Sequence, residues 1–121
     1  GGHESVDIAH RHSPSASALR VGTASRSSKS AILGLVRAGA LDLSKRKIRV
    51  NAVSPGVVET PMTQKLFQSL SVENIASIEK MHPLGLGRVE DIVRTINFLL
   101  SEDSRWITGQ NIVIDGGYSI Q

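Results

Sequence analysis

The sequence contains no cysteine and very few aromatic residues. The absence of cysteine among 121 residues excludes disulfides and thiolate metal sites, and it fits a reducing compartment such as the cytoplasm. Aromatic residues make up only 3% of the chain, so we expect an aliphatic core. They also provide no row of stacking platforms for nucleic-acid bases. We therefore predict a cytoplasmic protein with no nucleic-acid partner.

The sequence also has no long apolar run. No stretch approaches the roughly 20 apolar residues that a membrane-spanning helix needs, and residues 1–12 are too polar for a signal peptide. Lys and Arg number 14 against 11 Asp and Glu, a net charge of +3 that we interpret as solvated helix and loop faces. A hydrophobic content of 40% is enough for one packed domain. We expect a single domain over residues 1–121 and no membrane partner.

The most informative stretch runs from Ile48 to Met62 and reads IRVNAVSPGVVETPM. Its first half alternates as a short buried strand does, and Pro55-Gly56 then ends regular structure. In open parallel sheets, ligands bind beyond the carboxyl ends of the strands. The turn after this strand is therefore a candidate ligand site. An ordinary connection without a ligand remains an equal alternative on spacing alone.

The strongest predicted helix covers Ser27–Lys45. Apolar and small residues fall on one stripe at spacings of three and four, and a second stripe lies beside it. Because a helix that is apolar on two sides has more to bury than one sheet face, we interpret the second side as an oligomer contact. The two stripes consist of Ile32, Leu35, Val36, Gly39, Ala40 and Leu43, and of Leu33, Ala38 and Leu41.

The remaining elements alternate along the chain. We predict a strand over Ser5–Ala9, a loop from His10 to Ala18, and one or two short helices over Thr63–Lys80. A loop over residues 81–87 leads to an amphipathic helix over Val89–Leu100, and a last strand covers Asn111–Asp115. The inward residues of the helix should be Val89, Ile92, Val93, Ile96, Leu99 and Leu100. This order predicts a parallel α/β sheet with crossover helices, and about three strands leave its first edge unpaired.

Three histidines near the start of the chain invite a metal hypothesis. His3, His10 and His12 have no acidic or cysteine partner at ligand spacing. We therefore predict no metal site.

From about Lys29 onward the sequence resembles the C-terminal half of the short-chain dehydrogenase/reductase family. The matching stretches are SKSAILGLVRAGALDLSKRKIRVNAVSPGVVETPM and PLGLGRVEDIVRTINFLLSEDSRWITGQNIVIDGGYS. The 3-oxoacyl-acyl-carrier-protein reductase and polyol dehydrogenase-like branch is the most similar. The resemblance implies the C-terminal part of a Rossmann-type doubly wound parallel sheet, that is, one partial dinucleotide-binding domain without its N-terminal half. It also implies NAD or NADP as cofactor, a small alcohol or carbonyl substrate, and a homo-oligomer, either dimer or tetramer.

The resemblance also assigns roles to individual residues. Lys29 matches the lysine that binds the nicotinamide ribose and lowers the pKa of a catalytic tyrosine. The Pro55-Gly56-Val57-Val58 turn matches the segment against the nicotinamide, and Thr60 matches a residue that binds its carboxamide or a phosphate. Residues 63–80 fall where the family keeps a segment that covers the substrate.

Two catalytic positions depart from the family pattern. The tyrosine position, four residues before Lys29, holds Ser25, whose hydroxyl is far less acidic than a phenol with a pKa of about 10. The active-site serine position holds His10 or His12, depending on the alignment. The glycine-rich phosphate turn is not in this sequence.

Two functions follow from these observations. The first is a short-chain dehydrogenase/reductase-type oxidoreductase, present as a C-terminal fragment and inactive as it stands, with Lys29 and Ser25 as the candidate catalytic residues. The alternative is a non-catalytic binding or oligomerisation module that descends from the same family.

Overall fold

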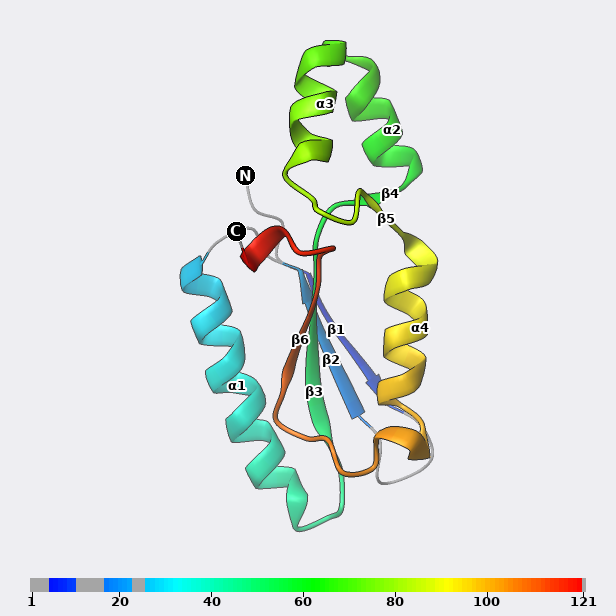
Figure 1. Cartoon of the computed structure of the whole chain (residues 1–121). Helices are drawn as coiled ribbons and strands as arrows, with labels where there is room; N and C mark the ends of the chain where they lie inside the picture. Colours follow the sequence, from blue (N-terminus) through cyan, green and yellow to red (C-terminus); the bar gives the residue numbers. More distant parts are fainter. Residues whose placement is uncertain (1–4, 11–16, 23–25, 121) are drawn as a thin grey trace. The chain divides into compact units, whose positions relative to one another are not determined.

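The computed structural model describes residues 5–10, 17–22 and 26–120, with side chains from residue 30 onward, and it shows an α/β chain (Figure 1). The chain divides into two compact units. Unit 1 comprises Gly1–Ser54 and Arg94–Ile112, and unit 2 comprises Pro55–Val93 and Val113–Gln121. Among the described residues, no helix is long and apolar enough to cross a membrane.

The main sheet has four strands in the order β1-β2-β3-β6. These are β1 (Ser5–His10), β2 (Ser17–Gly22), β3 (Val50–Pro55) and β6 (Asn111–Ile114). β2 pairs with β3 in parallel. The backbone bonds from the Ala52 amide to the Gln110 carbonyl and from the Gly56 amide to the Ile114 carbonyl advance together, so β6 also runs parallel to β3. The predicted parallel α/β sheet is confirmed for β2, β3 and β6.

The N-terminal part of the sheet corrects two predictions. The predicted loop to Ala18 is wrong at its end, because β2 already begins at Ser17 and continues to Gly22. β1 is confirmed but pairs antiparallel with β2, not in the predicted parallel order. Only residues 11–16 connect the two strands, and a parallel crossover needs a dozen or more residues. The sheet therefore has four strands rather than about three.

The longest helix, α1 (Arg26–Ser44), confirms the helix predicted over Ser27–Lys45. In unit 1 its buried Ile32 and Val36 pack with Ala52 of β3 in one apolar cluster, and Val50 lies against it. Leu35, on the same predicted stripe as Ile32 and Val36, is not buried, since 58% of its surface is exposed. The predicted stripe is wider than the face of α1 that the chain itself covers.

A polar network in unit 1 connects β3 to the chain that precedes β6. The buried Arg49 donates from Nη2 to the Leu99 and Ser101 carbonyls at 2.9 and 3.1 Å, and from Nη1 to the Ile107 carbonyl at 3.0 Å. Asn51, fully buried, donates to the same Ile107 carbonyl at 3.0 Å. Burial lowers the pKa of the Arg49 guanidinium, and the negative charge of Glu102 acts in the opposite direction. The network joins segments that are distant in sequence, and the Ser104 hydroxyl donates to the same Leu99 and Ser101 carbonyls.

Unit 2 contains the short helices α2 (Pro61–Gln68) and α3 (Val72–Lys80), which confirm two short helices in the predicted segment (Figure 1). Neither helix buries a residue. Between β3 and α2, β4 (Val58–Glu59) pairs in parallel with β5 (Gly87–Arg88).

The helix α4 (Val89–Leu99) confirms the helix predicted over Val89–Leu100 and begins with Glu90 and Asp91 in its first turn. Ile92 and Leu99 are buried as predicted. Val89 and Val93 are not buried, since 45% and 47% of their surfaces are exposed. A short 3-10 helix, η1 (Glu102–Ser104), precedes β6, and a second one, η2 (Tyr118–Ile120), follows it.

Candidate functional site

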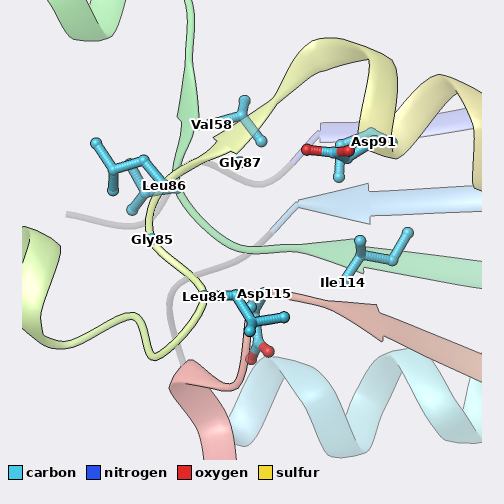
Figure 2. A pocket seen from close by; sticks show the side chains of 11 residues that line it. Val58, Leu84, Gly85, Leu86, Gly87, Asp91, Ile114 and Asp115 are labelled. Carbon is cyan, nitrogen blue, oxygen red and sulfur yellow. The ribbon is translucent and has the colours of Figure 1, made fainter.

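A pocket of about 440 Å³ lies in unit 2, beside the carboxyl ends of β3 and β6 (Figure 2). One wall comes from the segment after β3 and from the loop that leads into β5 and α4. The other wall comes from the end of β6. The pocket is lined by Val57, Val58, Leu84, Gly85, Leu86, Gly87, Asp91, Ile92, Ile114, Asp115 and Gly116. The strand ends therefore frame a cavity at the edge where parallel sheets bind ligands.

Gly56 is required by the close approach of the two strand ends. Its amide donates to the Ile114 carbonyl at 2.9 Å. A Cβ atom at this position would lie 2.8 Å from the Asp115 Cβ and 2.9 Å from the Asp115 Cα. Because these are atoms next to or in the backbone, a side chain here would push the strand ends apart. The predicted Pro55-Gly56 turn is thus a packed junction between the two strand ends, and the next residue, Val57, lines the pocket.

Val57 and Val58 contribute apolar surface to the pocket. The Val57 carbonyl accepts from the Gly87 amide at 3.1 Å, and Val58 is the β4 partner of Gly87. Val57 is 36% exposed, and Val58 is half-buried. The segment after the turn therefore presents a short apolar edge fixed by backbone bonds to the opposite loop.

Thr60 is the N-cap of α2. Its hydroxyl accepts from the Thr63 amide at 3.1 Å, and its own amide donates to the Thr63 hydroxyl at 2.7 Å, which completes a capping box. The Thr63 hydroxyl also donates to the Val58 carbonyl at 3.0 Å. The hydroxyl predicted to contact a cofactor is thus also a structural group that orients the start of α2.

Comparison with known proteins places this geometry in a family. A family model described as Enoyl-(Acyl carrier protein) reductase matches residues 12–119. The chain belongs to the short-chain dehydrogenase/reductase family. It is 44% identical to 3-oxoacyl-[acyl-carrier-protein] reductase FabG of Thermotoga maritima over 94 residues, which cover 77% of this chain and 37% of that protein. It is 42% identical to human (3R)-3-hydroxyacyl-CoA dehydrogenase over 91 residues, covering 74% of this chain and 33% of that protein.

Solved short-chain dehydrogenase/reductase structures share the fold. ElxO with NADP bound has a TM-score of 0.68 at 39% identity, over 78% of this chain and 38% of its own. 4-Hydroxyisoleucine dehydrogenase complexed with NADH has a TM-score of 0.69 at 38% identity, over 78% of this chain and 39% of its own. The chain thus spans little more than a third of the proteins that it matches. The predicted Rossmann-type fold and family are confirmed for the part that is covered.

The structure separates the predicted site residues into two groups. Pro55, Gly56, Val57, Val58 and Thr60 lie together in unit 2, and the two valines line the pocket. Lys29 lies near the start of α1, in unit 1.

The other predicted positions are only partly described. Ser25 and His12 lie outside the described residues, and His10 is the last residue of β1. His3 is also outside them. Among the residues that the structure describes, no group of three or more His, Cys, Asp or Glu side chains could hold a metal ion.

Two acidic residues that the sequence analysis did not select also line the pocket. The Asp91 carboxylate accepts from the Arg88 amide at 2.8 Å at the start of α4. The Asp115 carboxylate accepts from the Gly117 and Ser119 amides at 3.1 and 3.0 Å. An acidic residue in a helix's first turn and another before Gly116-Gly117 were visible in the sequence. Both patterns are common in caps and turns, so neither pointed to a pocket by itself.

Proposed function

We propose that this chain is the C-terminal part of an NAD(P)(H)-dependent oxidoreductase that acts on a small alcohol or carbonyl substrate. The observation that carries the proposal is the packed Pro55-Gly56 turn, which leads directly into the pocket residues Val57 and Val58, in a family whose similar structures hold NADP or NADH. When bound, the nicotinamide donates or accepts the hydride. Because the chain spans about a third of its relatives, the activity of the whole protein is part of the proposal.

The described residues fit the nicotinamide end of such a cofactor. Gly56 lets the ends of β3 and β6 pack closely, and Val57, the next residue, offers an exposed apolar edge to the pocket. The Thr60 hydroxyl accepts a bond from the Thr63 amide and lies 3.3 Å from the Thr63 hydroxyl, a long contact that it would exchange to donate to a carboxamide or phosphate oxygen. Lys29 would bind the ribose from the first turn of α1. We propose these residues as the cofactor-binding set, with NAD and NADP both open.

The proposed chemistry is incomplete at Ser25. Reduction of a carbonyl needs a proton donor, and a serine hydroxyl is a poor one at neutral pH. Lys29 would favour the ionised form of a phenol one helical turn away, but it has no phenol to act on here. We therefore expect the chain to bind cofactor better than it turns over substrate.

The experiment restores the missing group with Ser25→Tyr. General acid catalysis contributes roughly 10²–10⁴-fold, so the variant should raise kcat for carbonyl reduction by at least about 100-fold with little change in cofactor affinity. Ser28→Tyr, one residue before Lys29, is the matched control and should leave the rate low. The intact mass of the expressed protein, compared with the 13.0 kDa of this chain, is measured first. If the parent protein, with Ser25, already reduces carbonyls as fast as other family members, then Ser25 does not limit catalysis.

The second candidate is a non-catalytic binding or oligomerisation module. The exposed apolar residues of α1 favour it, since Leu35 and Leu41 are 58% and 75% exposed. A second copy of the chain that covers this face would make the proposed homo-oligomer, which we place in the cytoplasm. Analytical ultracentrifugation measures the oligomeric state, and fluorescence titration measures the binding of NADH and NADPH. A tight oligomer that binds neither nucleotide supports the non-catalytic module, whereas nucleotide binding supports the oxidoreductase.

A further inference from the structure

His82 is a buried polar residue just outside the pocket. Only 5% of its surface is exposed, and its Nδ1 lies 2.9 Å from the Ile78 carbonyl in the last turns of α3. A carbonyl only accepts, so Nδ1 carries the proton and donates. The imidazole is thereby fixed against the end of α3.

The His82 ring packs against η2, the 3-10 helix that follows β6. It stacks on the ring of Tyr118 in η2, with centroids 5.0 Å apart and an angle of 25° between the planes. Next to this pair, the Leu84 amide donates to the Gly116 carbonyl at 2.9 Å. Gly117 lies so close to Pro83 that an added Cβ would be 3.0 Å from the proline ring. Three neighbouring contacts therefore hold residues 82–84 against residues 116–118.

These two segments continue directly into opposite walls of the pocket. The pocket is lined by residues 84–87, which follow His82, and by residues 114–116, which precede Tyr118. Figure 2 labels Leu84 and Gly87 of the first segment and Ile114 and Asp115 of the second. A contact that joins the two segments outside the cavity fixes the distance between its walls. Loss of the contact would let the end of β6 and the loop before β5 move apart.

We propose that His82 and Tyr118 form a clasp that sets the spacing of the pocket walls, which makes His82 a positioning residue for the ligand. This inference rests on the proposed function only for the identity of the ligand, a nicotinamide nucleotide. The clasp connects the end of α3 to the pocket through His82, so it also ties the position of that helix to ligand binding.

The first test measures hydrogen exchange of the Leu84 amide, which donates to the Gly116 carbonyl and so joins the two walls. Tyr118→Leu and His82→Ala should each accelerate this exchange by about 3- to 10-fold, the range that an aromatic pair supports. The double variant should show little more than either single one, since both remove the same contact. Tyr118→Phe keeps the stacked ring and should behave like the parent chain. Ile120→Ala, at an 86% exposed position in the same η2, is the matched control.

The second test measures binding of NADH and of NADPH by fluorescence titration in the same variants. In Tyr118→Leu and His82→Ala, the nucleotide affinity should fall by about the factor by which Leu84 exchange accelerates. Tyr118→Phe should keep the affinity of the parent chain. Unchanged Leu84 exchange in both single variants would overturn the clasp. Faster exchange with unchanged affinity would overturn its positioning role. If the parent chain binds neither nucleotide, the proposed function fails, while the exchange data still decide whether the clasp exists.

Discussion

Unit 1 holds its helix by burial, whereas unit 2 holds its two short helices by their caps. In unit 1, Ile32 and Val36 of α1 are buried against β3. In unit 2, α2 and α3 have 8 and 9 residues and bury none of them. Isolated helices below about 12–15 residues are marginal in water. The buried core therefore stabilises α1 in unit 1. By contrast, α2 and α3 in unit 2 depend mainly on the local hydrogen bonds at their ends.

The polar groups of the two units differ in the same way. Arg49 and Asn51 connect segments about 50 residues apart in the sequence of unit 1, through bonds that are buried or partly buried. Most side-chain bonds that hold α2 and α3 reach only three or four residues along the chain, as those of Ser71 and Ser77 do. Long-range bonds fix a tertiary structure, and short-range bonds fix only a turn of helix. Substitutions should therefore cost more in unit 1 than in α2 or α3.

Arg49→Met should give the largest loss of stability. It leaves three carbonyls without their charged donor, and we expect the free energy of unfolding to fall by about 2–4 kcal/mol. Arg46→Met, at an exposed position three residues earlier, is the control and should change it by less than about 0.5 kcal/mol. Urea unfolding measures both variants. If Arg49→Met and Arg46→Met lower the free energy of unfolding equally, then the hydrogen bonds of Arg49 add no stability beyond that of a surface charge.

Val36→Ala and Leu66→Ala test the comparison directly. Val36 is fully buried, and removal of two methyl groups should cost about 2 kcal/mol. Leu66 of α2 is 57% exposed, so its truncation should cost less than about 0.5 kcal/mol. Thermal unfolding of the two variants measures the difference. A larger effect at Leu66 would mean that α2 is buried in solution.

Thr60→Ala should give a smaller loss than Arg49→Met or Val36→Ala. Loss of the N-cap hydroxyl costs about 1 kcal/mol, and the effect should be confined to α2. Hydrogen exchange of the α2 amides would show it as faster exchange at the start of that helix. Thr60→Ser keeps the hydroxyl and should restore protection. Unchanged exchange in Thr60→Ala would contradict the capping role.

The strong periodic segments could be predicted from the sequence. The stripe in residues 27–45 and the alternation before Pro55-Gly56 gave α1 and β3 to within about two residues, the usual precision of boundaries. β2 was not predicted, because Leu19 and Val21 are its only large apolar residues and a Ser/Pro run precedes it. Its strand structure depends on pairing with β1 and β3, which no local pattern contains.

The candidate site was predictable only in part. The Pro55-Gly56 turn stood out because proline fixes its φ angle and has no N–H to donate, whereas glycine leaves the backbone free to turn. The rest of the lining did not, because Asp115 and Leu84 reach the same pocket as Val57 only through the pairing of β6 with β3 and of β5 with β4. His82 likewise looked like an ordinary loop residue until its ring was found against Tyr118.

The sequence by itself determined the family, the helices with a clear apolar stripe, the turn at the end of β3 and the serine at the tyrosine position. These are local properties of spacing and residue type. The tertiary structure decided the antiparallel β1, the buried network of Arg49, the pocket walls and the clasp at His82. The network, the pocket walls and the clasp join residues that are distant in sequence and meet only when the strands pair and their segments pack, and the direction of β1 depends on its pairing with β2.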